Sequence, residues 1–239
     1  MTKSNWESTK ARSQYHFDTE SWNPKWDQVE HLGYIQPCWV TELAEAIEQA
    51  KPVTWRTRGK PGDDKIRSSQ EHDSEEYDLE SYGMDKNYVV TNINYAIAPV
   101  FQTIADKFGL QDCMARIHVQ YPGQVWNLHL DKLEKWMPAD PTQVVRYFVQ
   151  LTDWQQGHFW SYGNYMWSRW HAGDVSTFDW IHVPHSTANA GHLPRATLQI
   201  TGIKTQETDK FLNSFKDQNE AILPKTACVM AIPMPWSML

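Results

Sequence analysis

Short runs of alternating apolar and polar residues dominate the chain from Met114 to Lys204. Runs of this length, rich in β-branched and aromatic residues, predict about eight strands joined by short turns. The runs cover residues 116–121, 125–130, 144–151, 158–162, 165–170 and 175–178, followed by the segments that begin at His185 and Arg195. Gly and Pro at the junctions, as in Pro122-Gly123, are typical of turns. Strands spaced in this way predict a closed or double-sheet β architecture.

Helical periodicity is confined to three segments outside this region. Thr41 to Ala50 has Thr as an N-cap and apolar residues at helical spacing, so it predicts a short helix. Tyr95 to Phe108 reads as an amphipathic helix that ends at Gly109. A third helix is expected over residues 208–218. The two earlier helices would back one sheet.

The remaining segments complete a single predicted domain, residues 1–239. Residues 1–112 would form an N-terminal part, with an irregular arm over 1–35 and a loop over 56–85. Residues 113–204 would form the β core, and 205–239 a C-terminal helix and tail. The acidic run in the loop, residues 71–80, is typical of a solvated segment, but it could also order over a site as a lid.

Composition narrows the possible partners and the compartment. The formal net charge of −7 argues against a nucleic-acid binder held mainly by phosphate contacts. Cys38, Cys113 and Cys228 are scattered without a CxxC pair, which indicates reduced thiols and a cytoplasmic protein. The amino terminus lacks the apolar segment of a signal peptide, and prolines in the apolar tail, residues 221–239, argue against a membrane helix. Thirteen Trp suggest large rings that fill the interior and mouth of a barrel.

The stretch Asn127-Leu128-His129-Leu130-Asp131 holds the first pair of candidate ligands. If it is a strand, His129 and Asp131 are two residues apart and project from the same face. Two such side chains can hold one metal ion from a single strand end. The pair alone is weak evidence, because this spacing arises by chance in many strands.

A second cluster begins at His185 and continues through residue 200. Its ends look extended, and its middle contains a Gly and a Pro, which is typical of a turn. Folded as a hairpin about position 190, the cluster would make His185 and Arg195 cross-strand neighbours, roughly 5 Å apart at Cβ. His182 lies three residues before His185 and could compete with it as a ligand.

Together these residues predict an iron centre beside a carboxylate-binding group. Two His and one carboxylate on one face form the facial triad of non-haem Fe(II) oxygenases, which leaves coordination positions for a co-substrate and O2. Arg195 can pair a dicarboxylate co-substrate through two charge-assisted hydrogen bonds. Thr197 lies on the same strand face and can donate its hydroxyl to the same carboxylate.

The order of these motifs resembles the Fe(II)/2-oxoglutarate-dependent oxygenase superfamily, and within it the aspartyl/asparaginyl β-hydroxylase branch. The similarity covers about ninety residues, from Ala115 to Lys204. It is carried by Tyr121-Pro122-Gly123, Arg146 at the start of a long strand, Trp167, Gly173-Asp174, Thr177-Phe178-Asp179, and His185-x-x-x-Asn189 leading to Arg195. The resemblance implies a mainly β fold, the double-stranded β-helix or cupin-like jelly-roll barrel, backed here by N-terminal helices.

The resemblance also implies a site and an activity. His129, Asp131 and His185 would bind Fe(II), and Arg195 and Thr197 would hold the distal carboxylate of 2-oxoglutarate. The branch characteristically lacks the carboxylate ligand that Asp131 supplies here, and a retained carboxylate favours hydroxylation over halogenation. The implied activity is hydroxylation of an amino acid, a peptide side chain or a small metabolite with O2, releasing succinate and CO2.

Several residues have two readings. Arg146 lies where that branch places a second co-substrate contact, but it could simply be an ion-paired strand residue. His118 could contact the co-substrate or be a satisfied core histidine. Trp136 and Trp154 could stack on a substrate or pack the barrel. The following histidines are expected to be structural or on the surface: His158, His171, His182 and His192.

Two other functions fit part of the pattern. A non-catalytic jelly-roll module that binds a small molecule or sugar would explain the strands and the Trp content, but it leaves His185 and Arg195 as a coincidence. A different cupin metalloenzyme, such as a dioxygenase or isomerase, typically uses three or four His, and Arg195-x-Thr197 favours the 2-oxoglutarate assignment. The sequence leaves the oligomeric state open.

Overall fold

The computed structural model describes residues 29–54, 88–131, 133, 137, 139–163, 165–180 and 182–222, except for the side chains of 216–222. The predicted acidic loop, the arm before residue 29 and Trp136 lie outside the described residues. The same is true of Cys228 and the tail after residue 222.

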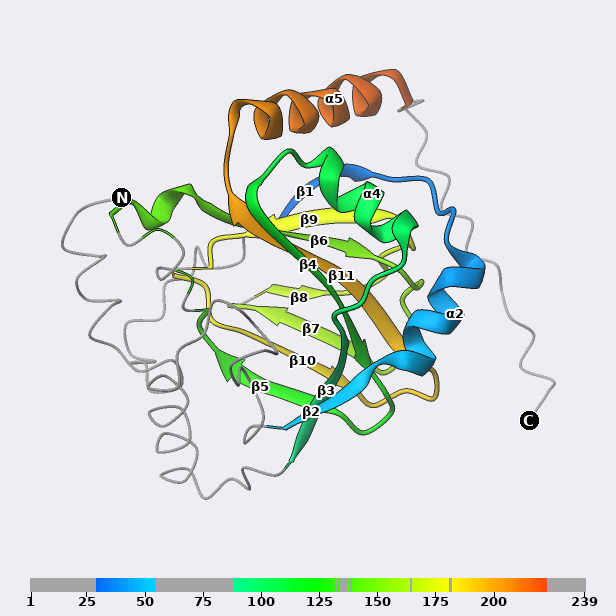
Figure 1. Cartoon of the computed structure of the whole chain (residues 1–239). Coiled ribbons are helices and arrows are strands. Elements are labelled where there is room, and N and C mark those ends of the chain that lie inside the picture. Colours follow the sequence, from blue (N-terminus) through cyan, green and yellow to red (C-terminus); the bar gives the residue numbers. More distant parts are fainter. Residues whose placement is uncertain are drawn as a thin grey trace.

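Two antiparallel sheets face each other (Figure 1). In the described part of the chain the larger sheet has seven strands, in the order β1 (Val29–Tyr34), β9 (Asp174–Phe178), β6 (Val144–Gln150), β11 (Arg195–Ile203), β4 (Gln111–Gln120), β3 (Val89–Asn94) and β2 (Lys51–Thr54). The smaller sheet, over the same described residues, has four: β5 (Val125–His129), β10 (His185–Asn189), β7 (His158–Tyr162) and β8 (Tyr165–Trp167). Because the chain crosses repeatedly between the two sheets, the architecture is a jelly roll. The prediction of a mainly β, jelly-roll fold backed by N-terminal helices is confirmed.

Alternation along β11 gives the larger sheet two different faces. Leu198 and Ile200 are fully buried in an apolar core on the outer face. Thr197 and Gln199 point the other way and line a cavity between the sheets. Strands β4 and β6 repeat this alternation, so the larger sheet is apolar on the outside and polar on the inside.

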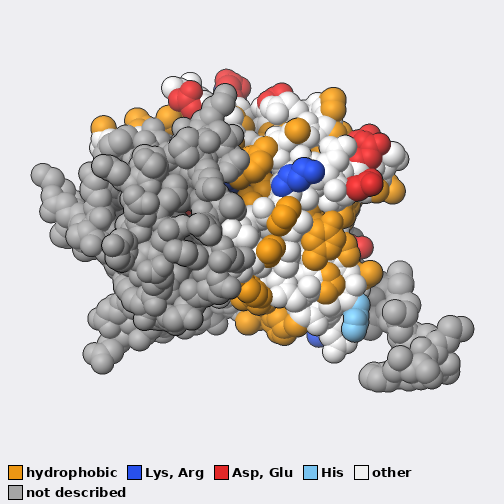
Figure 2. All heavy atoms as spheres, turned by 60° about the horizontal axis from the view of Figure 1, so that its bottom comes forward, with side chains coloured by type: hydrophobic (Ala, Val, Ile, Leu, Met, Phe, Trp, Pro, Cys, Tyr) orange, Lys and Arg blue, Asp and Glu red, His pale blue; other side chains and the backbone are white. Residues whose placement is uncertain are grey.

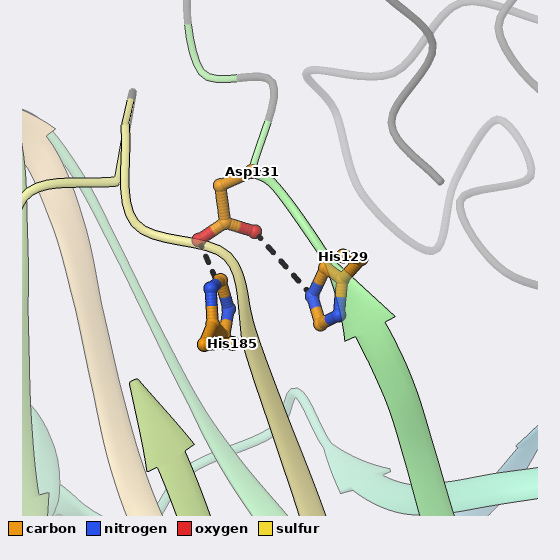
Figure 3. Close-up of side chains that lie close together, drawn as sticks. All are labelled: His129, Asp131 and His185. Atoms are coloured by element: carbon orange, nitrogen blue, oxygen red, sulfur yellow. Dashed lines mark ion pairs between the residues drawn. The ribbon is translucent and has the colours of Figure 1, made fainter. Parts of the chain in front are cut away.

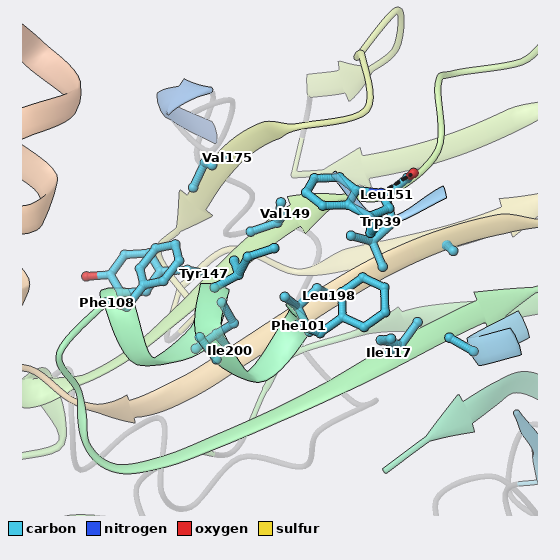
Figure 4. Close-up of a cluster of buried hydrophobic side chains, with 14 of the residues drawn as sticks. Trp39, Phe101, Phe108, Ile117, Tyr147, Val149, Leu151, Val175, Leu198 and Ile200 are labelled. Carbon is cyan, nitrogen blue, oxygen red and sulfur yellow. Dashed lines mark hydrogen bonds between the residues drawn. The ribbon is translucent and has the colours of Figure 1, made fainter. Parts of the chain in front are cut away.

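Helices cover the outer, apolar face (Figures 1 and 4). They are α2 (Val40–Gln49), α4 (Pro99–Lys107) and α5 (Gln206–Ile222), and a short 3-10 turn, η1 (Pro141–Gln143), precedes β6. Trp39 packs into this core and its Nε1 donates to the carbonyl of Leu151 at 3.2 Å. Phe108 stacks on Tyr147 with 4.9 Å between ring centroids. The helices therefore seal one side of the sheet that carries the polar inner face.

Helix ends differ from the sequence prediction at their starts. α2 begins at Val40, so the prediction that Thr41 caps it is wrong, and Trp39 at the N-cap makes no side-chain capping bond. α4 begins at Pro99 rather than at residue 95, because proline is favoured at the first helical position and disfavours helix before it. Gly109, with φ +59°, ends this helix as predicted.

Three strands, β1, β2 and β3, were not predicted from the sequence. β1 lies within residues 1–35, which were expected to be irregular. β1 pairs with β9 at the sheet edge, and Gly33 in it approaches the ring of Phe215 so closely that a Cβ would lie 2.7 Å from it. β2 contains Pro52, which an edge strand tolerates because one row of its amides needs no partner. β3 pairs with β4 and extends the sheet toward β2.

The predicted hairpin between the His185 and Arg195 segments is wrong. β10 pairs with β5 and β7, whereas β11 pairs with β4 and β6. Asn189 explains the crossing, because its Nδ2 donates to the carbonyls of Gln120 and Leu193, both at 2.8 Å, and its Oδ1 accepts from the amide of Gly191. The turn is thereby tied to the end of β4 and the chain changes sheets.

The outer face of the smaller sheet carries exposed apolar side chains. Phe159 on β7 and Met166 on β8 are 46% and 53% exposed. Figure 2, which brings the bottom of Figure 1 forward, shows hydrophobic side chains over the middle of the described surface and acidic ones along its upper edge and right side.

Cys38 and Cys113 are free thiols. Among the described residues, none of the helices combines the length and the apolar character needed to cross a membrane.

Candidate metal centre

His129, Asp131 and His185 converge between the two sheets (Figure 3). One ligand atom from each lies within 4.8 Å of the others. Nε2 of His129 is 3.9 Å from Oδ1 of Asp131, and Nε2 of His185 is 3.8 Å from Oδ2. All three side chains are buried. Within the described residues, this is the one group of three His, Cys or acidic side chains placed to hold a metal ion.

Strand ends bring the three side chains together. His129 ends β5 and His185 begins β10, and the two are direct partners in the antiparallel pair. The sequence predicted that Asp131 lies in the same strand as His129. In the structure Asp131 follows the end of β5 by two residues and reaches the site from beyond the strand. A position past the strand end leaves the carboxylate free of the strict alternation of side chains along a strand.

Backbone carbonyls set the orientation of both imidazoles. Nδ1 of His129 lies 2.6 Å from the carbonyl oxygen of Asn127, and Nδ1 of His185 lies 3.4 Å from that of Val183. Because a carbonyl can only accept, Nδ1 carries the proton in each contact, and Nε2 keeps its lone pair. Both lone pairs then lie on the nitrogen nearest Asp131, as ligation of one metal requires.

Aromatic rings wall in the two histidines. Trp126 stacks on His129 with a centroid distance of 5.6 Å, and Tyr162 stacks on His185 at 5.9 Å. Phe178 meets His185 edge-on at 4.6 Å. Tyr162 is fully buried, and burial raises its pKa well above the ordinary value of 10. The rings hold the imidazoles in place and exclude water from behind them.

The candidate ligands open into a cavity of about 570 Å³, counted with its mouth. Its lining combines polar side chains of the larger sheet with aromatic rings: Thr91, Arg116, His118, Gln120, Trp126, Arg146, Phe148, Trp160, Thr187, Arg195, Thr197 and Gln199, besides the three candidate ligands. Among the described lining residues three carry guanidinium groups and one, Asp131, carries a carboxylate. Such a lining favours anionic ligands.

Arg195 is buried among neutral groups. Its Nη2 donates to Oε1 of Gln120 at 2.7 Å and its Nη1 to the carbonyl of Phe159 at 3.2 Å. The guanidinium lies 4.8 Å from the ring centroid of Trp160. Gln120 in turn donates to Oγ1 of Thr187 at 2.9 Å, so the network joins the two sheets. Burial lowers the pKa of Arg195 to about 10, which still leaves it charged at neutral pH.

Thr197 and His118 lie side by side on the cavity wall as cross-strand partners. The hydroxyl of Thr197 donates to Oε1 of Gln150 at 3.1 Å, so its proton is directed at this amide. The Nε2 atom of His118 is buried and has no hydrogen-bond partner among the described residues. Burial, and then the charges of Arg116 and Arg146, lower its pKa well below 6.5, so it is neutral. Their predicted contacts with a co-substrate stay predictions.

Arg146 lies against the candidate metal ligand. Its Nη1 donates to Oδ2 of Asp131 at 2.5 Å, and its Nε donates to Oγ1 of Thr201 at 2.9 Å. The ion-paired reading of this residue therefore describes the structure, while its predicted contact with the co-substrate stays a prediction.

Two further residues, His182 and Trp154, had been given alternative roles from the sequence. Nδ1 of His182 lies 2.7 Å from an oxygen of Asp179, away from the triad, so His182 does not replace His185. Trp154 packs against the aromatic core between the sheets, and its Nε1 donates to the carbonyl of His158.

Sequence reasoning missed several lining residues of the cavity, among them Arg116, Gln120 and Gln199. The signal was present, because Arg116 and Gln120 alternate with apolar residues on β4 just as Arg195 and Gln199 do on β11. Two adjacent strands with the same alternation place their polar members on one face. Sequence alone, however, does not say whether that face meets solvent or a second sheet.

Comparison with known proteins adds little to this picture. No family model matches the sequence, and no curated protein matches it. Among solved structures, the chain is similar to a predicted oxalate decarboxylase from Thermotoga maritima, with 14% identity over 47% of this chain and 80% of that chain and a TM-score of 0.31. It is also similar to a cupin 2 conserved barrel domain protein from Salinispora arenicola, with 13% identity over 52% and 84% and a TM-score of 0.30. At identities and TM-scores this low, the likeness decides nothing about family, activity or ligand.

Proposed function

We propose that the protein is an Fe(II)- and 2-oxoglutarate-dependent dioxygenase that hydroxylates a small molecule or a peptide side chain. The observation that carries the proposal is Arg195, which lines the same cavity as the two-histidine, one-aspartate cluster and is only 5% exposed. Its partners among the described residues are neutral. A buried guanidinium is costly unless a negative charge balances it, so this position suits an anionic ligand.

The spacing between Arg195 and the triad suits a five-carbon dicarboxylate. Arg195 bonds to the carbonyl of Phe159, whose partner Ala188 lies three residues along β10 from His185. Three residues at about 3.3 Å each span roughly 10 Å. Four C–C bonds of about 1.5 Å span roughly 5 Å, a metal–oxygen bond adds about 2 Å, and a charge-assisted hydrogen bond adds about 3 Å. With a carbon–oxygen bond of about 1.2 Å at each end, the fully extended path is roughly 12 Å, which is comparable to this strand distance.

Each residue has a defined part in this proposal. His129, Asp131 and His185 would hold Fe(II), since two imidazoles and one carboxylate form a donor set typical of non-haem iron. When bound, iron supplies the oxidative chemistry that couples decarboxylation of 2-oxoglutarate, giving succinate and CO2, to oxidation of a substrate C–H bond by O2. Arg195 would fix the distal carboxylate, and its planar fork gives that carboxylate one orientation.

Neighbouring groups would support this binding. Thr197 can accept or share a hydrogen bond beside Arg195, and neutral His118 can donate or accept on the cavity wall. Trp160 covers the guanidinium from the smaller sheet. Rings packed on both the imidazoles and the guanidinium keep water out, which strengthens every charge interaction inside.

Replacement of Arg195 tests the proposal directly. Arg195→Met should weaken binding of 2-oxoglutarate to the Mn(II)-loaded protein by about thirtyfold or more, which corresponds to roughly 2 kcal/mol, while Mn(II) binding stays within about threefold of wild type. Arg169→Met, which removes an exposed guanidinium, is the matched control. Anaerobic titration calorimetry gives both constants, and succinate release with Fe(II) and O2 reports turnover.

Two outcomes would contradict the proposal. Unchanged affinity for 2-oxoglutarate in Arg195→Met would show that another group anchors the co-substrate, or that it does not bind here. Binding without any succinate release in the wild-type protein, even uncoupled, would instead favour the non-catalytic binding module.

A further inference from the structure

Arg146 is bonded to the candidate ligand Asp131 and is held there from a second side. Its Nη1 contacts Oδ2 of Asp131 at 2.5 Å, while its Nε donates to Thr201 at 2.9 Å. Thr201 is the direct cross-strand partner of Arg146 in the β11–β6 pair. The guanidinium therefore sits on the rigid centre of the larger sheet and reaches across to a carboxylate that follows the smaller one.

Burial strengthens the interaction between the charges of Arg146 and Asp131. The side chains of Arg146 and Asp131 are each 6% exposed, so water screens neither charge well. A buried carboxylate needs a counter-charge, and Arg146 supplies one without any metal. The same carboxylate lies 3.8 to 3.9 Å from the Nε2 atoms of His185 and His129, where a divalent cation would need it. Guanidinium and cation would therefore share one carboxylate.

We propose that Arg146 is a positioning residue of the metal centre. It holds the Asp131 side chain between the two histidines, and it competes with the divalent cation for this carboxylate. The affinity of the site for metal is therefore lower than the triad alone would give, because a positive charge remains next to the bound ion and draws on the same oxygen atoms. This inference rests on the metal-binding part of the proposed function and not on the identity of the co-substrate.

Arg146 also fixes the carboxylate that a cation would use, because its Nη1 holds Oδ2 of Asp131 from the opposite sheet. Since guanidinium and cation would compete for this carboxylate, an exchangeable metal is the expected result.

Two neutral replacements of Arg146 test the competition. In Arg146→Met and Arg146→Gln, the dissociation constant for Mn(II) should fall by about tenfold, because the competing charge is gone. Mn(II) should also raise the melting temperature of both variants more than that of wild type. The measurement is Mn(II) titration followed by the electron paramagnetic resonance of the free ion, at fixed pH and ionic strength and without 2-oxoglutarate. Arg146→Gln keeps an amide donor for Asp131 and so provides a second test if the Met variant folds poorly.

Arg195→Met is the matched control, since it removes a guanidinium from the same cavity that does not bond to the triad. Its Mn(II) dissociation constant should stay within about threefold of wild type. Thr201→Val provides an independent test that leaves every charge in place. By loosening the guanidinium it should tighten Mn(II) binding by about threefold.

Unchanged or weaker Mn(II) binding in the Arg146 variants would overturn the inference. Unchanged Mn(II) binding together with about tenfold weaker 2-oxoglutarate binding would make Arg146 a co-substrate contact instead. The two proposals fail separately: wild-type protein that binds no Mn(II) would remove the metal centre, whereas loss of 2-oxoglutarate binding alone would remove only the co-substrate assignment.

Discussion

The two faces of strand β11 are both buried and chemically opposite. Leu198 and Ile200, at 0% exposure, fill space under the helices. Thr197 and Gln199, at 3% and 8%, line the cavity and are each bonded to a polar neighbour, Gln199 to Arg116. The outer face contributes to stability through close packing, because the loss of even one methyl group from such a core lowers the free energy of unfolding. The inner face contributes little by burial, because each polar group only exchanges water for a protein partner.

The difference teaches where to look for function. A fold that needed only stability would gain from apolar residues on both faces, as a buried ion pair is often matched by well-packed hydrophobic residues. The inner face instead keeps three guanidinium groups and one carboxylate in the described cavity lining. Buried charges of this kind are costly for folding, and they would suit the binding of an anion and a cation together.

Asp131→Ala, in the cavity lining, is expected to have the largest effect. Turnover coupled to substrate should be lost, and Mn(II) binding should weaken, because one of three ligands is gone. The free energy of unfolding of the metal-free protein should fall by roughly 3–5 kcal/mol, since Arg146 loses its buried carboxylate. Denaturant unfolding and succinate release across an Fe(II) titration measure both effects.

Asp131→Asn and Asp131→Glu refine this result. Asn keeps the volume and an acceptor, so it should retain more stability than Ala yet still lose turnover. Glu should also lose turnover, because one methylene moves the oxygen by more than the ~0.5 Å that such sites tolerate. Near-wild-type turnover by Asp131→Ala at saturating Fe(II) would mean that His129 and His185 hold the metal alone.

Leu198→Ala and Thr197→Val, on adjacent residues of opposite faces, sharpen the comparison. Leu198→Ala should lower the free energy of unfolding by about 2–5 kcal/mol through a cavity in the outer core, with ligand affinities of the folded protein unchanged. Thr197→Val keeps the volume and removes one hydroxyl, so it should cost only about 1 kcal/mol. Its effect should appear instead as weaker 2-oxoglutarate binding. Equal losses of stability in the two variants would contradict the division between the faces.

A further expected effect is a pH dependence from His118. Its pKa is lowered in the folded protein by burial, and then by Arg116 and Arg146, while the unfolded chain keeps a value near 6.5. The unfolded state therefore binds more protons below this pH, and folding stability is lost as the pH falls. Wild type should lose up to about 1.4 kcal/mol per pH unit more than His118→Leu between roughly pH 6.5 and 5.

Urea unfolding at several pH values measures this slope. His171→Gln, a change at an exposed histidine, is the control. Identical slopes for wild type and His118→Leu would show that His118 is not held neutral by the fold.

Much of the β core could be predicted from the sequence, since local alternation alone identifies strands. The run His158–Tyr162 was predicted with its observed bounds. The strands that were missed lack such a pattern: β2 contains Pro52, and β3 contains two Asn, a residue depleted in strands. β3 becomes a strand because β4 offers an edge to pair with, and β2 then pairs with β3; no local pattern carries these long-range causes.

The hairpin error has the same origin. A Gly and a Pro correctly indicated a turn after Asn189, but a turn does not say whether the next strand joins the same sheet or the opposite one. Here the chain changes sheets, and His185 and Arg195 reach one cavity because the sheets face each other. The three residues of the candidate metal centre could be named from their types and order, whereas the Arg146–Asp131 contact joins two elements whose approach depends on the whole fold.

The rings that pack on the site also give the protein its own optical reporters. Trp126 lies against the imidazole of His129, and Trp160 lies against the guanidinium of Arg195, so each end of the cavity has an indole of its own. A paramagnetic ion on the histidines would quench the emission of Trp126 first, and a carboxylate at Arg195 would shift that of Trp160. With one of these indoles replaced by Phe at a time, fluorescence would show whether a metal ion and 2-oxoglutarate bind here, and in which order, without any added label.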